Sequence, residues 1–302
     1  MSKSKKLVFF GNERLSTGLS SVGMPTLKAL LSESYDITAI VANYSEGKSR
    51  NTHQLEIAEV AKRHNIPLLL PSNPLEISEQ LSSYKADAAI LVAYGKIIPD
   101  SIIDIFPRGI INIHPSLLPK YRGSTPIETA ILDGVSETGV SIMKLVRRMD
   151  AGLVFAQARI NLSGNESKQE LADKLSSLGA ETLIKTLPSI LDGSANAKSQ
   201  DEKRATYSKI LKKEDGILDW AKPARQLERE VRAYAGWPRS VTRVFGYKII
   251  VTKAHETNAP AGKEKDEMLI VRANPGWLQI VELIAPSGRT VSGADFVRGY
   301  RK

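Results

Sequence analysis

Residues 109–132, GIINIHPSLLPKYRGSTPIETAIL, combine the features of a buried strand with those of a polar site. The stretch begins with an isoleucine-rich run that is typical of a strand inside a protein, and Asn112 and His114 interrupt that run. Side chains two positions apart on a strand point to the same face, so the amide and the imidazole are predicted to project together. A proline-bounded loop follows, and a short helix is predicted over residues 125–134.

Strand-like apolar runs alternate with helical patterns on the N-terminal side of this stretch. Residues 7–11, 36–43 and 86–95 are apolar throughout rather than alternating, which is typical of strands covered on both faces. Helical patterns occupy the segments between them. This alternation predicts an α/β fold with a mostly parallel sheet and right-handed crossovers.

The last part of the chain has a different pattern. Residues 138–146 and 153–162 predict a hairpin at the far edge of the sheet, and a helix is predicted over residues 167–191. Residues 192–208 are rich in small and polar residues and are the best linker candidate. Beyond them one helix is predicted over residues 223–236, and short strands broken by Gly, Pro and Asn predict a small β-barrel or sandwich.

The excess of positive over negative charge lies in the last third of the protein. The 302 residues include 42 Lys and Arg and 33 Asp and Glu, which gives a formal net charge of +9. Residues 1–202 hold 22 charges of each sign, whereas residues 203–302 hold 20 basic and 11 acidic residues. A neutral body with a basic terminal domain predicts a polyanionic partner for that domain, with a merely basic surface as the alternative.

The composition excludes several classes of site. The chain contains no cysteine, so it has no disulfide, no thiolate metal site and no cysteine nucleophile. No apolar run reaches the length of a membrane span, and the basic start lacks the features of a signal peptide. We therefore expect a cytoplasmic protein.

The pair Asn112 and His114 is predicted to lie at the carboxyl end of a parallel strand, where open α/β sheets place their ligands. A buried polar pair satisfied by backbone groups is an equally good interpretation of these two residues alone. Ser116 lies close by, but no G-x-S-x-G turn surrounds it, and the other histidines lack the spacing of metal ligands. The turn after the first strand has no G-x-G-x-x-G pattern, which argues against NAD and FAD. Assisted acyl transfer fits best, because it needs donors for an oxyanion and a base for an amine.

A longer pattern points to a family. The combination of N-x-H-x-S-L-L-P, R-G, T-G-V-S-I-M and D-x-G within residues 112–152 closely resembles the folate-dependent formyltransferases. The resemblance implies a Rossmann-like catalytic domain that uses 10-formyltetrahydrofolate as co-substrate and no metal. It also implies that Asn112 and His114 stabilise the oxyanion, while Asp150 orients the histidine and helps to move the amine proton. Local pattern alone does not favour this aspartate over other aspartates of the chain.

Two backbone segments are predicted to line the folate site of such a domain. One is the S-L-L-P segment, and the other is the V-A-Y-G turn at residues 92–95. The S-L-L-P residues are Ser116, Leu117, Leu118 and Pro119.

The second half of the chain resembles the members of this family that act on methionyl-tRNA. Residues 207–244 contain a lysine-rich entry, a D-W pair, a Q-L helix and a W-P dipeptide. The resemblance implies a catalytic domain over residues 1–191, a linker over 192–205 and an OB-like β-barrel that binds tRNA over 206–302. It further implies initiator methionyl-tRNA as the formyl acceptor, a role in translation initiation, a monomer and no membrane partner.

Two regions depart from the family pattern. Residues 43–54 replace a longer and more basic loop that contacts the acceptor end of tRNA in many bacterial members, so Lys48 and Arg50 are its expected contacts here. The first turn, residues 11–25, is longer than the usual glycine turn. Two alternatives stay open: a sugar-nucleotide N-formyltransferase with the same folate donor, and a non-catalytic RNA-binding protein on a formyltransferase scaffold.

Overall fold

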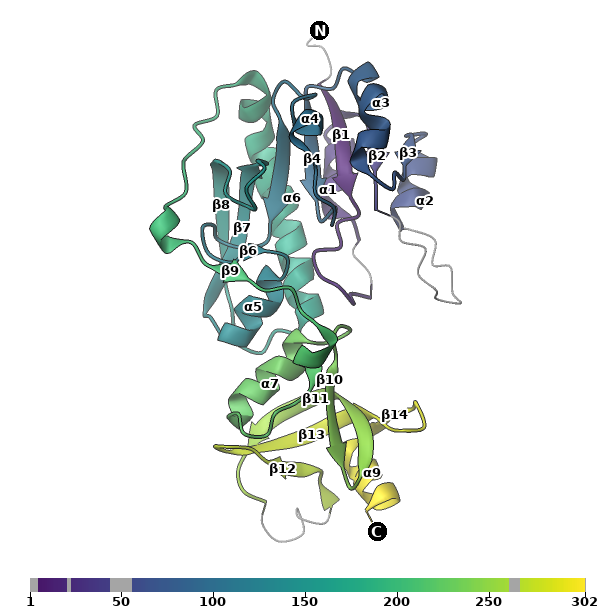
Figure 1. Cartoon of the computed structure of the whole chain (residues 1–302), viewed down its shortest axis with the longest axis vertical. Coiled ribbons are helices and arrows are strands. Elements are labelled where there is room, and N and C mark those ends of the chain that lie inside the picture. Colours follow the sequence, from purple (N-terminus) through teal and green to yellow (C-terminus); the bar gives the residue numbers. More distant parts are fainter. Residues whose placement is uncertain (1–4, 21–22, 44–55, 261–266, 302) are drawn as a thin grey trace.

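The computed structural model describes residues 5–20, 23–43, 56–260 and 267–301. The chain forms two units that follow one another along the long axis of the molecule (Figure 1). The first unit is built on a mixed sheet covered by helices, and the second on a curled antiparallel sheet.

The first unit contains a seven-stranded sheet in the order β3-β2-β1-β4-β5-β7-β8. The first five strands of that order run parallel to one another. Strand β7 pairs antiparallel with β5, and β8 pairs antiparallel with β7. The mostly parallel sheet and the hairpin at its far edge, both predicted from the sequence, are therefore confirmed. The strands are β1 (Lys6–Gly11), β2 (Asp36–Val41), β3 (Leu68–Leu69), β4 (Ala88–Val92), β5 (Ile110–His114), β7 (Glu137–Lys144) and β8 (Val154–Asn161).

Helices cover both faces of this sheet (Figure 1). Leu7 and Phe9 of β1 belong to one buried cluster, and Val8 and Phe10 belong to another on the opposite face. The first cluster includes α1, α2, α5 and α6, and the second includes α3 and α4. Burial on both faces explains why these strands are apolar throughout. The helices are α1 (Pro25–Ser32), α2 (Glu56–Arg63), α3 (Ser78–Ser83), α4 (Asp100–Ile103), α5 (Pro126–Asp133) and α6 (Lys168–Asp192).

The segment after α6 runs back along the first unit instead of leaving it directly (Figure 1). Its strand β9 (Tyr207–Ser208) pairs in parallel with β6 (Arg122–Gly123). The guanidinium of the fully buried Arg122 also binds Gln200 and Glu202. Residues whose composition predicts a linker are thus fastened to the first unit, and the exact domain boundaries stay predictions.

The second unit is an antiparallel sheet in the order β10-β11-β13-β12, with β14 paired to β13. The sheet curls into a half-barrel, and among the described residues no ladder joins β10 to β12. Its elements are α7 (Ala224–Ala233), β10 (Ser240–Val244), β11 (Tyr247–Thr257), β12 (Ile270–Arg272), β13 (Trp277–Ile284), β14 (Thr290–Ser292) and α9 (Gly293–Tyr300).

The prediction of a single helix in this unit was wrong. The predicted helix is α7, but α9 also forms at the end of the described chain and buries Phe296 and Val297 in the core of the unit. The side chain of Ser292 accepts a hydrogen bond from Asp295 N at 3.0 Å and caps the helix. With only eight residues and two glycines, α9 has a weak helical pattern, and its packing on the sheet stabilises it.

The two units contact each other through helices α5 and α7 and through two loops. The end of α7 carries Ala233 and Tyr234, which pack into the core of the first unit. The loops meet at Gly18 and Gly236, which both have positive φ angles. A Cβ atom on Gly236 would lie 2.3 Å from Gly18 O, so only glycine permits this approach of the two backbones.

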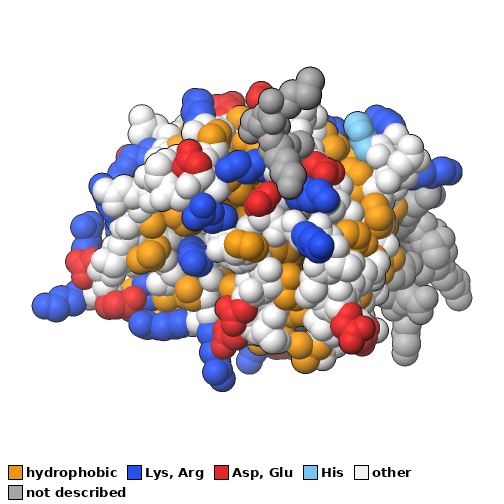
Figure 2. All heavy atoms as spheres, turned by 90° about the horizontal axis from the view of Figure 1, so that it is seen from above, with side chains coloured by type: hydrophobic (Ala, Val, Ile, Leu, Met, Phe, Trp, Pro, Cys, Tyr) orange, Lys and Arg blue, Asp and Glu red, His pale blue; other side chains and the backbone are white. Residues whose placement is uncertain are grey.

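Charged side chains of both signs are spread over the end of the molecule that the first unit forms (Figure 2). This distribution agrees with the equal numbers of acidic and basic residues in residues 1–202. Within the described part of the chain, no helix has the length and apolar character needed to cross a membrane.

Glu166 fastens the turn that precedes α6. Its carboxylate accepts hydrogen bonds from Ser163 N at 2.8 Å and Gly164 N at 3.1 Å. Burial by itself raises the pKa of this carboxyl, but the hydrogen bonds, led by the one from Ser163 N, outweigh burial and lower the pKa. A carboxyl with a lowered folded-state pKa stabilises the protein above its unfolded pKa, and this stabilisation is lost as the pH falls through the folded value.

We expect Glu166→Gln to lower the free energy of unfolding by about 1–3 kcal/mol at pH 7. The difference from the wild type should shrink as the pH falls below about 4, because the wild-type carboxyl then takes up a proton. Urea unfolding at several pH values measures this difference. Glu181→Gln, an exposed change on α6, is the control and should stay within about 0.5 kcal/mol. A difference that does not depend on pH would contradict the role of the ionised carboxylate.

Candidate active site

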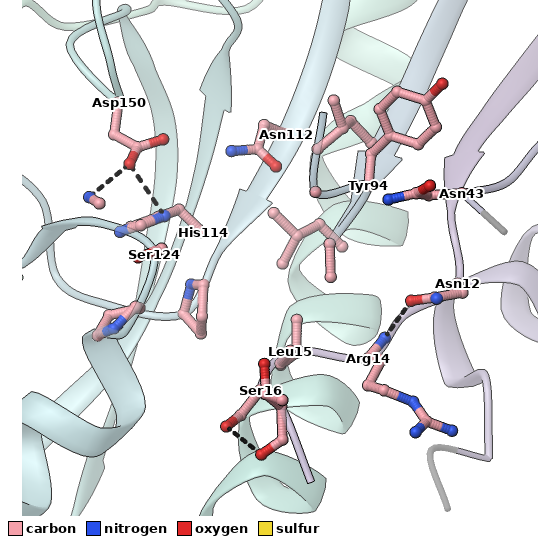
Figure 3. Close-up of a pocket in the computed structure, with 18 of the residues that line it drawn as sticks. Asn12, Arg14, Leu15, Ser16, Asn43, Tyr94, Asn112, His114, Ser124 and Asp150 are labelled. Atoms are coloured by element: carbon pink, nitrogen blue, oxygen red, sulfur yellow. Dashed lines mark hydrogen bonds and ion pairs between the residues drawn. The ribbon is translucent and has the colours of Figure 1, made fainter. Parts of the chain in front are cut away.

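A cavity of about 490 Å³ opens at the carboxyl ends of the parallel strands. It lies between β1 and β4, where the strand order reverses, which is the usual ligand position in open α/β sheets. Residues that directly follow β1, β4 and β5 form its wall (Figure 3). Among them are Ala93, Tyr94 and Gly95 of the V-A-Y-G turn, for which folate contacts are predicted from the sequence.

Gly11, directly before the cavity-lining Asn12, allows the ends of β1 and β4 to approach closely. Its φ angle is +118°, and a Cβ atom there would lie 1.9 Å from Val92 O. Glu13 N then donates a hydrogen bond to the same carbonyl at 3.3 Å. A side chain at position 11 would force the two strand ends apart.

Asn112 and His114 project into the cavity from the last residues of β5 (Figure 3). Both are nearly buried, with 6% and 4% of their surface exposed. Ile113 between them belongs to the core on the other side, where a Cβ on Gly179 of α6 would lie 2.7 Å from its Cγ2. The predicted shared face of the amide and the imidazole is confirmed.

The ring of His114 has a different neighbour at each nitrogen. Nε2 lies 3.0 Å from the carbonyl oxygen of Tyr121, which can only accept a hydrogen bond. Nε2 therefore carries a proton, and in the neutral ring Nδ1 carries the lone pair. Nδ1 lies 3.8 Å from Oδ2 of Asp150, a distance that suits an ion pair after protonation and exceeds a direct hydrogen bond.

Asp150 reaches the histidine from the turn between β7 and β8. Its φ angle of +47° lies in the left-handed region, which is uncommon for a residue other than glycine. Its Oδ2 accepts a hydrogen bond from Gly123 N at 2.7 Å, so the segment that follows the S-L-L-P loop fixes the carboxylate. The tertiary structure thus brings Asp150 to His114, as the family resemblance implies and as the local pattern does not reveal.

The S-L-L-P segment lies beside the cavity and outside its wall. Ser116 is fully buried, its hydroxyl donates to Lys120 O at 2.6 Å, and its carbonyl accepts from Ser141 Oγ at 2.7 Å. The next three residues line a neighbouring cavity of about 650 Å³. Folate binding by Ser116–Pro119 stays a prediction.

The first turn forms one wall of the cavity and was assigned no role from the sequence (Figure 3). Buried Glu13 anchors it, because its carboxylate accepts hydrogen bonds from Thr26 N at 2.9 Å and Leu27 N at 2.7 Å. This contact caps α1, whose N-cap residue offers no side-chain hydrogen bond. Burial raises the pKa of Glu13, and the two backbone N–H groups oppose that rise. Asn12 and Arg14 line the cavity on either side of this anchor, and the sequence signal was their position in the turn that follows a strand-ending glycine.

A buried ion pair lies behind the first turn. Lys168 Nζ lies 3.8 Å from Glu128 Oε1 and donates to Thr17 O at 2.7 Å and to Trp237 O at 3.2 Å. The hydroxyl of Ser16 donates to the same carboxylate oxygen. Burial lowers the pKa of Lys168 and raises the pKa of Glu128, and the attraction between the two groups opposes both shifts. One ammonium group therefore joins the cavity wall, α5, α6 and the second unit.

Two further predictions concern metal binding and the loop of residues 43–54, which is expected to contact tRNA. Lys48 and Arg50, the predicted tRNA contacts in residues 43–54, lie outside the described residues. Over the described ranges, no three His, Asp or Glu side chains are grouped so that they could hold a metal ion.

Both units match known protein families. Residues 15–187 match the formyl transferase family model, and residues 210–301 match that of the formyl transferase C-terminal domain. Methionyl-tRNA formyltransferase of Sulfurihydrogenibium sp. (strain YO3AOP1) is 32% identical over 94% of this chain and 96% of the relative. The protein of the same name from Chloroflexus aggregans is 36% identical over 93% of this chain and 95% of its own length.

Solved structures share the fold at lower identity. An N-formyltransferase from Helicobacter canadensis, in complex with folinic acid and dTDP-3-aminofucose, has a TM-score of 0.69 and 17% identity, covering 91% of this chain and 98% of that one. HypX from Aquifex aeolicus, in complex with tetrahydrofolic acid, has a TM-score of 0.67 and 16% identity, covering 99% of this chain and 47% of that one. The two family models and the relatives above 30% identity show that the chain belongs to the formyl transferase family, among the methionyl-tRNA formyltransferases.

Proposed function

We propose that this protein transfers the formyl group of 10-formyltetrahydrofolate to the amino group of methionine on initiator methionyl-tRNA, acting as a monomer in the cytoplasm. The observation that carries the proposal is the convergence of Asn112, His114 and Asp150 at one cavity. The chain that carries this cavity matches methionyl-tRNA formyltransferases along nearly its whole length.

The cavity suits a folate donor and an acyl acceptor. Its volume of about 490 Å³ lies in the range of small-molecule sites, about 300–1,000 Å³. Leu91, Ala93 and Pro115 supply apolar surface for a flat ring system, while amide, imidazole and carboxylate groups converge at one end. None of these polar groups is a nucleophile of the serine or cysteine kind, so the set suits direct attack by the amine of the acceptor.

Asn112 and His114 would have different roles in the transfer. Asn112 donates an amide hydrogen bond to the oxygen on which negative charge develops when the amine adds to the formyl carbon. His114 Nδ1 accepts the proton that the amine loses, and Asp150 stabilises the resulting imidazolium. The imidazolium adds a second donor for the oxyanion and returns its proton to the leaving folate nitrogen as the old carbon–nitrogen bond breaks. The new carbon–nitrogen bond joins the formyl group to methionine.

The decisive test is transfer of labelled formyl from 10-formyltetrahydrofolate to Met-tRNA. Initiator Met-tRNA should be formylated, while an amino-sugar nucleotide offered under the same conditions should stay unmodified. Formylation of the sugar nucleotide alone would support the sugar-nucleotide alternative. Binding of tRNA without transfer would support the non-catalytic alternative.

The basic second unit predicts a strong salt dependence of tRNA binding. Neutralisation of phosphates by Lys and Arg releases counterions, so the logarithm of affinity falls linearly with the logarithm of salt concentration. With about five phosphate contacts, the slope would be about −3.5 to −4.5. Fluorescence titrations of tRNA between low and physiological salt measure the slope, with folate binding as the control. Equal salt dependence for both ligands would contradict a polyanion-binding role for residues 203–302.

A further inference from the structure

Arg122 carries the largest of the fully buried side chains, and every N–H group of its guanidinium has a partner. Nε and Nη2 donate to Gln200 Oε1 at 3.1 and 2.8 Å. Nη1 and Nη2 donate to the two oxygens of Glu202 at 3.0 and 2.9 Å, and Nη1 also donates to Tyr207 OH at 3.3 Å. Five donors meet five acceptor contacts, so the guanidinium holds a fixed orientation.

Gln200 relays this orientation to the turn that carries Asp150. Its Oε1 faces the guanidinium, while its Nε2 donates to Asp150 O at 2.7 Å and to Gly152 O at 2.8 Å. All the hydrogen bonds that the Gln200 amide can make with good geometry are used, and its oxygen and nitrogen cannot exchange places without breaking them. Gln200 lies 50 residues after Asp150, in the segment whose composition predicts a linker.

The catalytic pair needs such external support. Asp150 has a left-handed φ angle, a conformation that costs about 1 kcal/mol or more for this residue type and persists only when its surroundings fix it. Three consecutive residues provide the support. Tyr121 accepts from the His114 ring through its carbonyl, Arg122 binds Gln200, and Gly123 donates its N–H to the Asp150 carboxylate.

We propose that Arg122 and Gln200 are positioning residues that set the distance between the Asp150 carboxylate and His114 Nδ1. On this proposal, which rests on the proposed function, residues 193–208 form a strap between the two units that controls the chemical step without touching either substrate. The 3.8 Å separation between the two groups is then a property of the strap as well as of the sheet.

Two isosteric substitutions separate positioning from stability. Gln200→Glu keeps the contacts to Arg122 but replaces the donating amide nitrogen by an oxygen, which repels the carbonyls of Asp150 and Gly152. We expect kcat to fall about tenfold to hundredfold, the effect of a misplacement of about 1 Å, with the KM of both substrates nearly unchanged. Glu214→Gln is the isosteric control, because Glu214 is exposed and, among the described residues, its side chain contacts neither Arg122 nor Gln200 nor the turn of Asp150. Its kcat should remain close to that of the wild type.

Gln200→Met provides a second route if the charge of Gln200→Glu disturbs folding, since it removes the same donors without adding an anion. Thermal unfolding of all variants reports whether each is folded. A wild-type kcat in both Gln200 variants would overturn the proposal. An equal fall in kcat in Gln200→Glu and Glu214→Gln would overturn it as well, because that result would show that the loss is not specific to Gln200.

A double-substitution cycle tests whether Gln200 acts through Asp150. If it does, Gln200→Glu should lower kcat little further in a protein that already carries Asp150→Asn. Independent, multiplicative losses would contradict the relay.

Amide hydrogen exchange tests the relay without any reaction. Gly123 N–H, bonded to Asp150 at 2.7 Å, should exchange slowly in the wild type and in Glu214→Gln, and faster in Gln200→Glu. Unchanged protection in Gln200→Glu would overturn the proposal. If the wild type transfers no formyl group, the proposed function fails, while the exchange rates of Gly123 still decide whether Gln200 positions Asp150.

Discussion

Replacing Asn112 by alanine is expected to lower kcat for formyl transfer at least about a hundredfold while the protein stays folded. Asn112 is 6% exposed and lines the cavity at the end of β5. Its side chain has no hydrogen-bond partner among the described residues, so its amide is available to a ligand. Removal of one oxyanion donor typically costs about 10²–10³ in kcat, because that donor acts in a water-excluded site.

Companion variants distinguish the loss of the Asn112 hydrogen-bond donor from the loss of its side-chain volume. Asn112→Asp retains the shape and replaces the donating nitrogen by an anionic oxygen, so it should be at least as impaired as Asn112→Ala. His114→Ala should also lose about a hundredfold or more, since it removes both a proton acceptor and a donor. Asn161→Ala, an exposed change on edge strand β8, is the control and should keep wild-type turnover. Single-turnover rates with labelled folate donor measure the chemical step, and a near wild-type rate in Asn112→Ala would remove this residue from the site.

Replacing Lys168 by methionine is expected to destabilise the protein by about 3–5 kcal/mol, the cost of breaking a buried ion pair. The side chains of Lys168 and Glu128 are 2% and 3% exposed, so the substitution leaves a carboxylate with no cation in a dry environment. The carbonyls of Thr17 and Trp237 lose their donor at the same time. Glu128 Oε2 has no hydrogen-bond partner in the structure, so the Ser16 hydroxyl and the Lys168 ammonium, both beside Oε1, compensate the charge of this carboxylate.

The same position offers a recovery experiment. Adding Glu128→Gln to Lys168→Met should restore part of the lost stability, because the uncompensated negative charge is then removed. Lys185→Met, an exposed lysine on the same helix, should change the free energy of unfolding by no more than about 0.5 kcal/mol. Urea unfolding at pH 7 measures all three. A loss below about 1 kcal/mol in Lys168→Met would show that the ammonium is not needed to compensate the buried carboxylate.

The fold of the first unit is readable from the sequence because its signals are local. Apolar runs bounded by helical patterns predict parallel strands, and the structure orders them as β3-β2-β1-β4-β5. The short helix α9 was missed because eight residues with two glycines carry little intrinsic helical preference, and its packing on β13 decides its formation.

In the candidate site, too, some features could be predicted from the sequence and others could not. The two-residue period of a strand places Asn112 and His114 on one face of β5. The sequence by itself therefore determined that an amide and an imidazole lie together at the carboxyl end of a strand. The composition likewise determined that the second unit carries the excess positive charge.

Only the tertiary structure decided which carboxylate joins them and what holds it there. Asp150 reaches His114 because the β7–β8 hairpin pairs with β5, and Gln200 supports its turn from 50 residues away. Contacts of this kind depend on how distant segments pack, and no local period or propensity encodes them. Strand β5 determines the direction of the Asn112 and His114 side chains. The packing of the hairpin and the strap determines the position of the Asp150 carboxylate.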